Sequence, residues 1–303
     1  MLGSAAGARV DEGRSSPGPA AASVARVDEV RSSPGPAAVL SARYAALKDE
    51  LDNNPFRRPI HLDSTEGRDS VTGEIFALLS APFATAGPVL EKPVYWCDIL
   101  ILHLNNKYCR PSVESRGTTL RLSVGSKGDQ ALSDAYRVNF VFRVSAKTAD
   151  YLQVNLLAEE GPLGTRNYRV ALEATPADDG RTFIRLSYGY SFGVVGQLAM
   201  RTYLNTVARN KVGFSVVPGG TGKAPQPVGG MRGAVERNTM RYYLAIEAFL
   251  GALSMPPAAR LEKSLRDWFS ATEAYPRQLH EIDQNEYLVM KRREYSRQLT
   301  EMN

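Results

Sequence analysis

The segment GYSFG (189–193) comes closest to a catalytic motif in this chain. It fits G-x-S-x-G, the turn that presents the serine nucleophile of many hydrolases, and Asp267 and His280 follow Ser191 in the order those enzymes use. Against a hydrolase, the chain has no HGGG-type oxyanion loop, and a pattern with so few fixed positions also arises by chance. We therefore expect Ser191 to lie at the end of a strand, and we keep the triad of Ser191, Asp267 and His280 as the weaker alternative.

Cys97 and Cys109 are the two cysteines of the chain. A zinc site needs about four ligands, which two cysteines and scattered histidines do not supply, and the spacing does not fit a CxxC redox pair. A disulfide or two buried thiols remain as interpretations. The segment HLNNKY between the cysteines is a natural chain reversal, so we favour the disulfide, which requires an oxidising compartment.

The remaining motif matches are weak, and we expect neither a metal nor a cofactor. GGTGK (219–223) lacks the residues of a phosphate loop, because Val217 and Ala224 stand where Gly and Ser or Thr are needed. The histidines have no metal-ligand spacing and are expected to be surface or hydrogen-bonded side chains: His61, His103 and His280.

Two polar segments are candidates for the mouth of a pocket. GPLGTRNYR contributes Arg166, and ERNTMR (236–241) contributes Glu236 and Arg241. Buried charges must be paired, so one interpretation is an Arg–Glu pair that fixes a helix to a sheet. The other is a clamp on the headgroup of a ligand, and both remain open.

The elements that must position these residues begin with an antiparallel sheet. From residue 70 onward, apolar and polar residues alternate with the two-residue period of strands, and short turn-rich segments such as GPLGT (161–165) join the runs. A parallel sheet would need crossovers of about a dozen residues or more. One apolar and one polar face is typical of an antiparallel sheet packed on one side. The predicted strands cover 119–124, 136–146, 151–158, 167–174 and 181–192.

Helical periodicity brackets the sheet. The segment 231–253 carries an apolar stripe that includes Tyr242, Ile246 and Phe249, and we expect it to pack on the apolar face of the sheet. Further helices are expected within 40–51, 81–104 and 196–213, and two charged helices within 256–303.

The first 38 residues contain a near-identical repeat, because ARVDEGRSSPGPAA (8–21) recurs as ARVDEVRSSPGPAA (25–38). Two copies rich in Pro, Gly, Ser and Ala have no apolar face to bury, so we expect residues 1–38 to be disordered. The organisation predicted from this is a disordered segment at 1–38, a helix and linker at 39–55, a folded domain at 56–255 and a helical tail at 256–303.

The composition is that of a globular protein, with 43% hydrophobic and 23% charged residues. The net charge of +5 is a mild surplus and does not predict nucleic-acid binding. No apolar run is long enough for an integral membrane span. The first 40 residues also lack the apolar stretch of a secretory signal, which conflicts with the oxidising compartment that a disulfide requires.

The order of elements resembles the START-like superfamily. GEIFALLSAPFATAGPVLEKPVYWCDIL is read as a strand, a "PF" turn and short helices ending in a tryptophan, followed by a sheet meander and a long helix. More narrowly, the two cysteines, GPLGTRNY and ERNTMRY resemble an uncharacterised bacterial group within it. The resemblance covers about residues 56–255. It implies an α+β helix-grip fold, in which a curved antiparallel sheet wraps around a long helix, here with extra C-terminal helices.

The resemblance also implies an apolar pocket that binds a lipid or another hydrophobic small molecule without catalysis. The residues expected to line it are Phe140, Phe142, Leu156, Arg166, Tyr188, Arg241, Tyr242 and Ile246. The alternatives are a pocket enzyme of the cyclase type or the Ser191 hydrolase, and a structural or interaction protein that uses the C-terminal helices. From the cysteines we expect a periplasmic or secreted protein, with a cytoplasmic one as the alternative.

Overall fold

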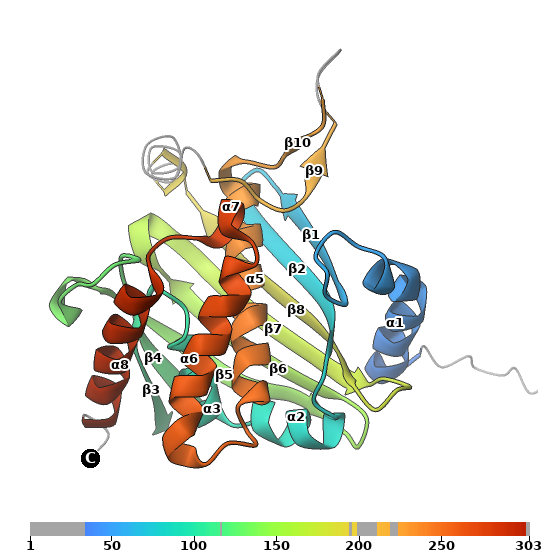
Figure 1. Ribbon diagram of the computed structural model, residues 1–303, viewed down its shortest axis with the longest axis horizontal. Helices are drawn as coiled ribbons and strands as arrows, with labels where there is room; N and C mark the ends of the chain where they lie inside the picture. The colour runs from blue at the N-terminus through green and yellow to red at the C-terminus, as the bar shows by residue number, and fades with distance from the viewer. Residues whose placement is uncertain (1–33, 116, 194–195, 199–210, 219–223, 301–303) are drawn as a thin grey trace, which may run out of the picture. The chain divides into compact units, whose positions relative to one another are not determined.

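The alternating segments form one antiparallel sheet of eight strands (Figure 1). Along the sheet the strands follow the order β1-β2-β8-β7-β6-β5-β4-β3, so β3 to β8 form a meander of six strands, of which β4 to β8 are the five predicted ones. β2 precedes the two short helices and pairs with β8. In chain order the strands are β1 (Ile60–Glu66), β2 (Ser70–Leu79), β3 (Asn106–Glu114), β4 (Gly117–Val124), β5 (Tyr136–Lys147), β6 (Leu152–Glu160), β7 (Thr165–Pro176) and β8 (Thr182–Phe192).

The structure, a computed structural model, describes residues 34–115, 117–193, 196–198, 211–218 and 224–300. Most of the N-terminal repeat and most of the helix expected over 196–213 lie outside these residues. Residues Pro34–Asn303 form one compact unit. Its helices are α1 (Pro36–Asp52), α2 (Phe83–Leu90), α3 (Pro93–Leu100), α5 (Gly230–Gly251), α6 (Pro257–Glu273), α7 (Pro276–Leu279) and α8 (Gln284–Thr300), and a short hairpin pairs β9 (Val216–Val217) with β10 (Gln226–Pro227).

The long helix α5 packs directly on one face of the sheet, which we call the inner face (Figure 1). Its contact with β2 is close because Gly73 has no side chain. A Cβ atom at Gly73 would lie only 2.5 Å from Oγ1 of Thr239 in α5. Strand residues on this face form the main core together with α2, α3, α5, α6 and α8, as the alternation predicted.

The opposite, outer face is partly covered by α1, which corrects the expectation of a sheet packed on one side only. Leu40, Tyr44 and Leu47 of α1 form a second core with side chains of β2 and β8. The Tyr44 and Phe183 ring centroids lie 4.9 Å apart. The physical reason is the run IFALL in β2, in which Phe76 and Leu78 are apolar on the outer face as well.

Helix α1 also begins earlier than predicted. Residues 36–38, which we expected to be disordered, form its first turn. Pro36 stands at the start of the helix, where its fixed φ angle favours the helical conformation, and two alanines follow.

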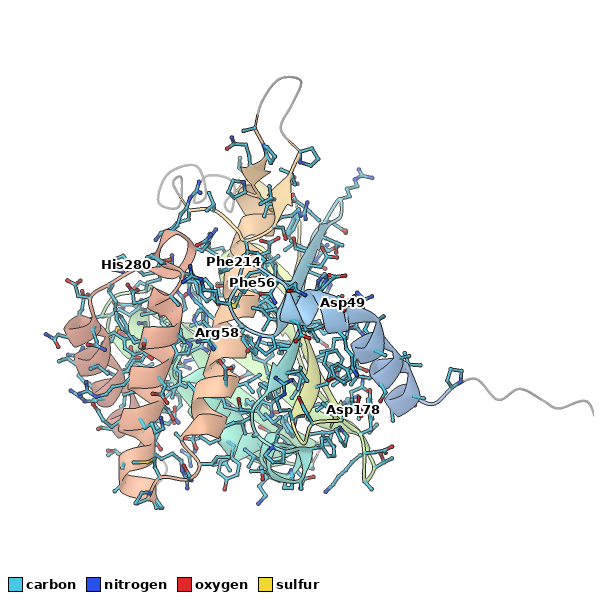
Figure 2. All side chains as sticks on the ribbon, turned by 45° about the vertical axis from the view of Figure 1, so that its right-hand side comes forward. Asp49, Phe56, Arg58, Asp178, Phe214 and His280 are labelled. Carbon is cyan, nitrogen blue, oxygen red and sulfur yellow. A yellow bond between two sulfur atoms is a disulfide. The ribbon has the colours of Figure 1, made fainter. Side chains whose placement is uncertain are left out.

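The C-terminal helices pack into the same core rather than extending from it. Trp268 of α6 and Tyr287 of α8 are buried and stack with ring centroids 5.1 Å apart. At the start of α7, Tyr275 contacts Phe56 and Phe214, two rings that Figure 2 shows side by side and whose centroids lie 5.7 Å apart. This aromatic contact joins segments that are far apart in the sequence.

Helix α8 is fixed to the edge strand β3 by buried charges. Lys107 Nζ lies 3.2 Å from Glu294 Oε1, and Lys291 Nζ donates to Glu294 Oε2 at 2.8 Å. Lys291 also donates to the backbone carbonyls of His103 and Asn106. Because all three side chains are buried, the one carboxylate of Glu294 holds two ammonium groups away from water.

The predicted disulfide between Cys97 and Cys109 is present and joins α3 to β3. The structure contains no free cysteine, since these are the two that the chain has. Among the described residues, none of the helices has the length and hydropathy needed to span a membrane.

Asp98, next to the disulfide, makes stability depend on pH. Burial is the main cause that raises its pKa from 3.8 to about 6, although Tyr295 and Arg260 oppose the shift. Because the unfolded carboxyl ionises at lower pH than the folded one, stability is lost as the pH rises from about 4 to about 6. Asp98→Asn is therefore expected to raise the free energy of unfolding at pH 7 by about 1–3 kcal/mol.

Urea unfolding between pH 4 and pH 8 measures this effect, with Asp134→Asn on an exposed turn as the control. An Asp98→Asn variant whose stability falls with pH as steeply as the parent protein's would contradict the assignment.

Candidate functional site

Six of the residues expected in a pocket belong to the core between the inner face and the helices that cover it. Those on the sheet are Phe140, Phe142, Leu156 and Tyr188, and those on α5 are Tyr242 and Ile246. Arg241 is buried on another side of α5, where it donates to Leu279 and Glu281 beside α7. Arg166 is exposed at the start of β7 and pairs in register with Ser191 on the outer face. Arg166 and Arg241 therefore do not act on the same ligand group.

Two buried tyrosines, Tyr188 and Tyr190, and two partly buried ones, Tyr168 and Tyr242, gather where the carboxyl end of β8 meets α5. The ring of Tyr188 lies 5.2 Å from that of Tyr242, 6.0 Å from that of Tyr190 and 6.2 Å from that of Tyr168, measured between centroids. Tyr242 in turn lies 4.9 Å from the ring of His103. We call Tyr168, Tyr188, Tyr190, Tyr242, His103 and Asn238 the tyrosine–histidine cluster.

His103 is buried in this cluster and neutral. Burial, followed by the nearby charges of Arg241, Lys291 and Lys127, holds its pKa well below the usual value. The backbone N–H of Asn105 donates to Nδ1 at 3.1 Å, so the proton of the neutral ring sits on Nε2. Nε2 has no hydrogen-bond partner among the described residues. Asn238 lies close to both His103 and Tyr188, but its contact with His103 does not reach hydrogen-bond geometry.

The phenols of the cluster are also neutral. Loss of solvent raises the pKa of Tyr168, Tyr188, Tyr190 and Tyr242. A neutral phenol donates one hydrogen bond and accepts others, as the Tyr168 hydroxyl does at 2.8 Å from Oγ1 of Thr165. The cluster is therefore an uncharged group of rings and hydrogen-bonding atoms inside an otherwise apolar core.

Positive charge lies beside the cluster. Glu281, between α7 and α8, accepts from Arg241 at 2.8 Å and from Lys127 at 2.6 Å, and Lys211 lies 3.7 Å away. Burial alone would raise the pKa of Glu281, but these cations outweigh it and lower the pKa. Burial lowers the pKa of Lys127 to about 8 despite the attraction of Glu281. Several cations thus share one ionised carboxylate at this side of α5.

Glu236 has a structural role instead of a place in the cluster. Its Oε1 accepts from the hydroxyl of Ser64 at 2.5 Å, and its Oε2 accepts from the backbone N–H groups of Phe214 and Ser215 at 2.6 and 2.9 Å. These bonds fix α5 to β1 and to the 211–218 segment. The charges of ERNTMR thus hold α5 to other elements. Arg241 pairs with Glu281, which lies between α7 and α8, so this Arg–Glu pair joins α5 to the C-terminal segment and not to the sheet as expected.

The structure does not bring Ser191, Asp267 and His280 together. Ser191 lies within β8 on the outer face, paired with Ser70, instead of on a strand-to-helix turn. Asp267 accepts from Lys263 at 2.6 Å, and Nδ1 of His280 lies 3.0 Å from Glu273. Figure 2 shows His280 among the C-terminal helices, which cover the inner face. Nor do the described residues contain a group of three or more His, Cys, Asp or Glu placed to hold a metal ion.

Of the six residues of the cluster, the sequence predicted Tyr188 and Tyr242 as pocket residues and missed the other four. Tyr168 and Tyr190 share the inner face with Tyr188, so the strand alternation carried a signal for them. His103 was expected at the surface or with its hydrogen bonds made, and no sequence signal indicated its burial. It follows α3 in a segment whose position depends on the disulfide and on Lys291.

Comparison with known proteins gives likeness in three dimensions alone. No protein-family model matches the chain, and no curated protein matches it in sequence. Human StAR-related lipid transfer protein 5 matches 56% of this chain and 89% of its own at 13% identity, with a TM-score of 0.30. Ara h 8.0201 matches 64% and 99% at 12% identity, with a TM-score of 0.34. Norcoclaurine synthase from Thalictrum flavum matches 48% and 91% at 15% identity, with a TM-score of 0.31. Scores this low carry no inference about a ligand or an activity.

The fold therefore follows from the topology of the chain itself. The chain runs from β2 through the short helices α2 and α3 into the six-strand meander β3–β8, and then into the long helix α5 on the inner face. The last strand of the meander, β8, pairs with β2. This arrangement is the helix-grip fold, with β1, α1 and the C-terminal helices added to it.

Proposed function

We propose that this protein is a non-enzymatic binding protein for a hydrophobic small molecule, held between the inner face and α5 at the tyrosine–histidine cluster. The observation that supports this is the buried Nε2–H of His103, which has no partner among the described residues. A buried donor without a partner costs about 1–3 kcal/mol, and a ligand acceptor would remove that cost.

The chemistry of the cluster suggests the class of ligand. Its rings are apolar on their faces and neutral at their hydroxyls, so an uncharged molecule with an aromatic or ring-shaped body and one acceptor group would fit. A charged headgroup would instead have to reach Arg241, which already pairs with Glu281. Binding is favoured over acid–base catalysis because the burial that shifts these pKa values holds His103 and the tyrosines neutral.

The uncharged dye N-phenyl-1-naphthylamine tests this proposal by fluorescence titration. We expect saturable binding to the parent protein. Ile246→Trp places a large ring one turn along α5 from Tyr242. Because the ring would fill the space of the ligand, dye binding is expected to weaken at least tenfold, while the free energy of unfolding changes by less than the roughly 1–3 kcal/mol that overpacking a solid core costs. Val289→Trp is the control, because it introduces the same ring at an exposed aliphatic position on α8, and it should bind the dye like the parent.

A solid core at this interface would give the opposite pattern. The parent would not bind the dye, and Ile246→Trp would overpack the core at a cost of about 1–3 kcal/mol. That pair of results would remove the binding proposal.

We further propose a periplasmic or secreted location. It is supported by the disulfide between Cys97 and Cys109, because disulfides persist in oxidising compartments. Fractionation of the cells that make the protein, followed by thiol alkylation, tests this. Recovery of fully reduced protein from the cytoplasm would contradict it.

A further inference from the structure

Several hollows lie on the outer face of the sheet. One of them has a volume of about 650 Å³ and crosses five strands of the sheet. Its floor follows one row of register partners, from Val141 in β5 through Leu157, Arg169 and Gly189 to Thr72 in β2. Gly189 contributes to the depth, because a side chain there would meet Thr72 at 2.7 Å.

Two further hollows continue this row toward β4. A hollow of about 460 Å³ shares the lining residue Val141 with the hollow of about 650 Å³. A hollow of about 330 Å³ shares Arg121, Arg137 and Asn139 with the hollow of about 460 Å³. Because neighbouring hollows share lining residues, the three form a row across β4, β5, β6, β7, β8 and β2, which we call the outer trough. It lies on the half of the outer face that α1 leaves uncovered.

The outer trough is rich in arginine. Arg121, Arg137, Arg143 and Arg169 line it, against Glu114 and Glu159. Arg121 pairs with Glu114 at 2.9 Å. In the part of the chain that the structure describes, Arg137, Arg143 and Arg169 form no ion pair.

This pattern contrasts with the adjoining part of the same face. Between the trough and α1, Arg185 is satisfied by two carboxylates, with Glu74 at 2.5 Å and Glu173 at 2.9 Å. Arg185 thus shows how an arginine on this face is neutralised within the fold, whereas Arg137, Arg143 and Arg169 of the trough have no carboxylate partner among the described residues. Carboxylates of a bound partner could pair with these guanidinium groups through two parallel hydrogen bonds each.

We propose that the outer trough binds an extended acidic segment of a partner protein. Six strands spaced about 4.8 Å apart span about 24 Å, which is the length of about seven residues in extended conformation. A row of recessed hollows fits an extended chain, whereas a flat lipid surface would be met by projecting side chains. The complementary charge favours a segment with carboxylates at every second or third residue.

Fluorescence anisotropy with a fluorescein-labelled heptapeptide of alternating glutamate and serine tests this proposal. We expect saturable binding that weakens as salt rises from 50 to 500 mM, because exposed charges are screened. Arg143→Gln combined with Arg169→Gln is expected to weaken binding about tenfold, since it removes two charge-assisted contacts. Arg57→Gln combined with Arg277→Gln is the matched control, because both arginines are exposed and form no ion pair among the described residues.

Three outcomes would overturn the proposal. The parent protein could fail to bind the peptide, the two double variants could bind it equally, or a peptide with glutamine in place of glutamate could bind as well. Sedimentation with vesicles of phosphatidylcholine and phosphatidylglycerol at 3:1 tests the lipid alternative. Vesicle binding that needs Arg143 and Arg169, without peptide binding, would assign the trough to a lipid surface instead. Equal urea midpoints for all variants show that folding is not the cause.

Discussion

Glu294→Gln is expected to destabilise the protein by about 3–5 kcal/mol, because it removes the one carboxylate that holds two buried lysines. Among the described residues, Lys107 and Lys291 would then have no carboxylate in a salt bridge, since Asp129 acts on Lys107 only from a longer distance. Glutamine has nearly the same size as glutamate and keeps one carbonyl acceptor, so the loss of stability measures the contribution of the negative charge. Urea unfolding at pH 7 gives the free energy, and Glu286→Gln, exposed on the same helix, is the control.

The same network predicts how the loss depends on pH. Burial, more than any neighbouring charge, lowers the pKa of Lys291 to about 8. A lysine with a lowered pKa binds fewer protons when folded than when unfolded, so its cost to stability falls as the pH rises above about 8. The effect of Glu294→Gln should therefore be smaller at pH 9 than at pH 6.

A second variant separates charge from packing. Replacing Lys107 and Lys291 by Met and Glu294 by Leu removes all three charges and fills a similar volume, and it should recover most of the stability lost in Glu294→Gln. A triple variant that is as unstable as the single one would show that the hydrogen bonds to the backbone, and not charge pairing, fix α8 to β3.

Removing the disulfide is the second large effect that we expect. The bridge joins residues that are 12 apart in sequence, and the loop-entropy relation gives about 3 kcal/mol for closing a loop of about this length. Cys97→Ser combined with Cys109→Ser should lower the free energy of unfolding by about that amount. Guanidinium unfolding with and without dithiothreitol measures it.

The reductant supplies the control for this prediction. Dithiothreitol should lower the unfolding midpoint of the parent protein and leave that of the double serine variant unchanged. The parent, denatured without reductant, should show no free thiol. Two titratable thiols, or a midpoint that reductant does not move, would contradict a structural role for the bridge.

The sequence by itself determined five of the eight strands, β4 to β8, and the inner face of each of these. A two-residue period is local information, because neighbouring side chains of a strand point to opposite faces. For this reason the alternation alone assigns Phe140, Phe142, Leu156 and Tyr188 to the inner face. The long helix could be placed over them from its own apolar stripe, and the cysteine spacing permitted the disulfide that the structure contains.

What only the tertiary structure decided is what each face of the sheet meets. Periodicity does not predict that α1 covers part of the outer face. The segment IFALL in β2 is apolar on both faces, and only the folded chain shows that α1 packs on the second of them. It also does not separate Arg166, on the outer face, from Arg241, which pairs with Glu281 some 40 residues away. The burial of His103 and the row of hollows from Val141 to Thr72 depend on contacts between distant segments. Local patterns determine which way a side chain points, and the packing of distant elements determines whether it meets protein, ligand or water.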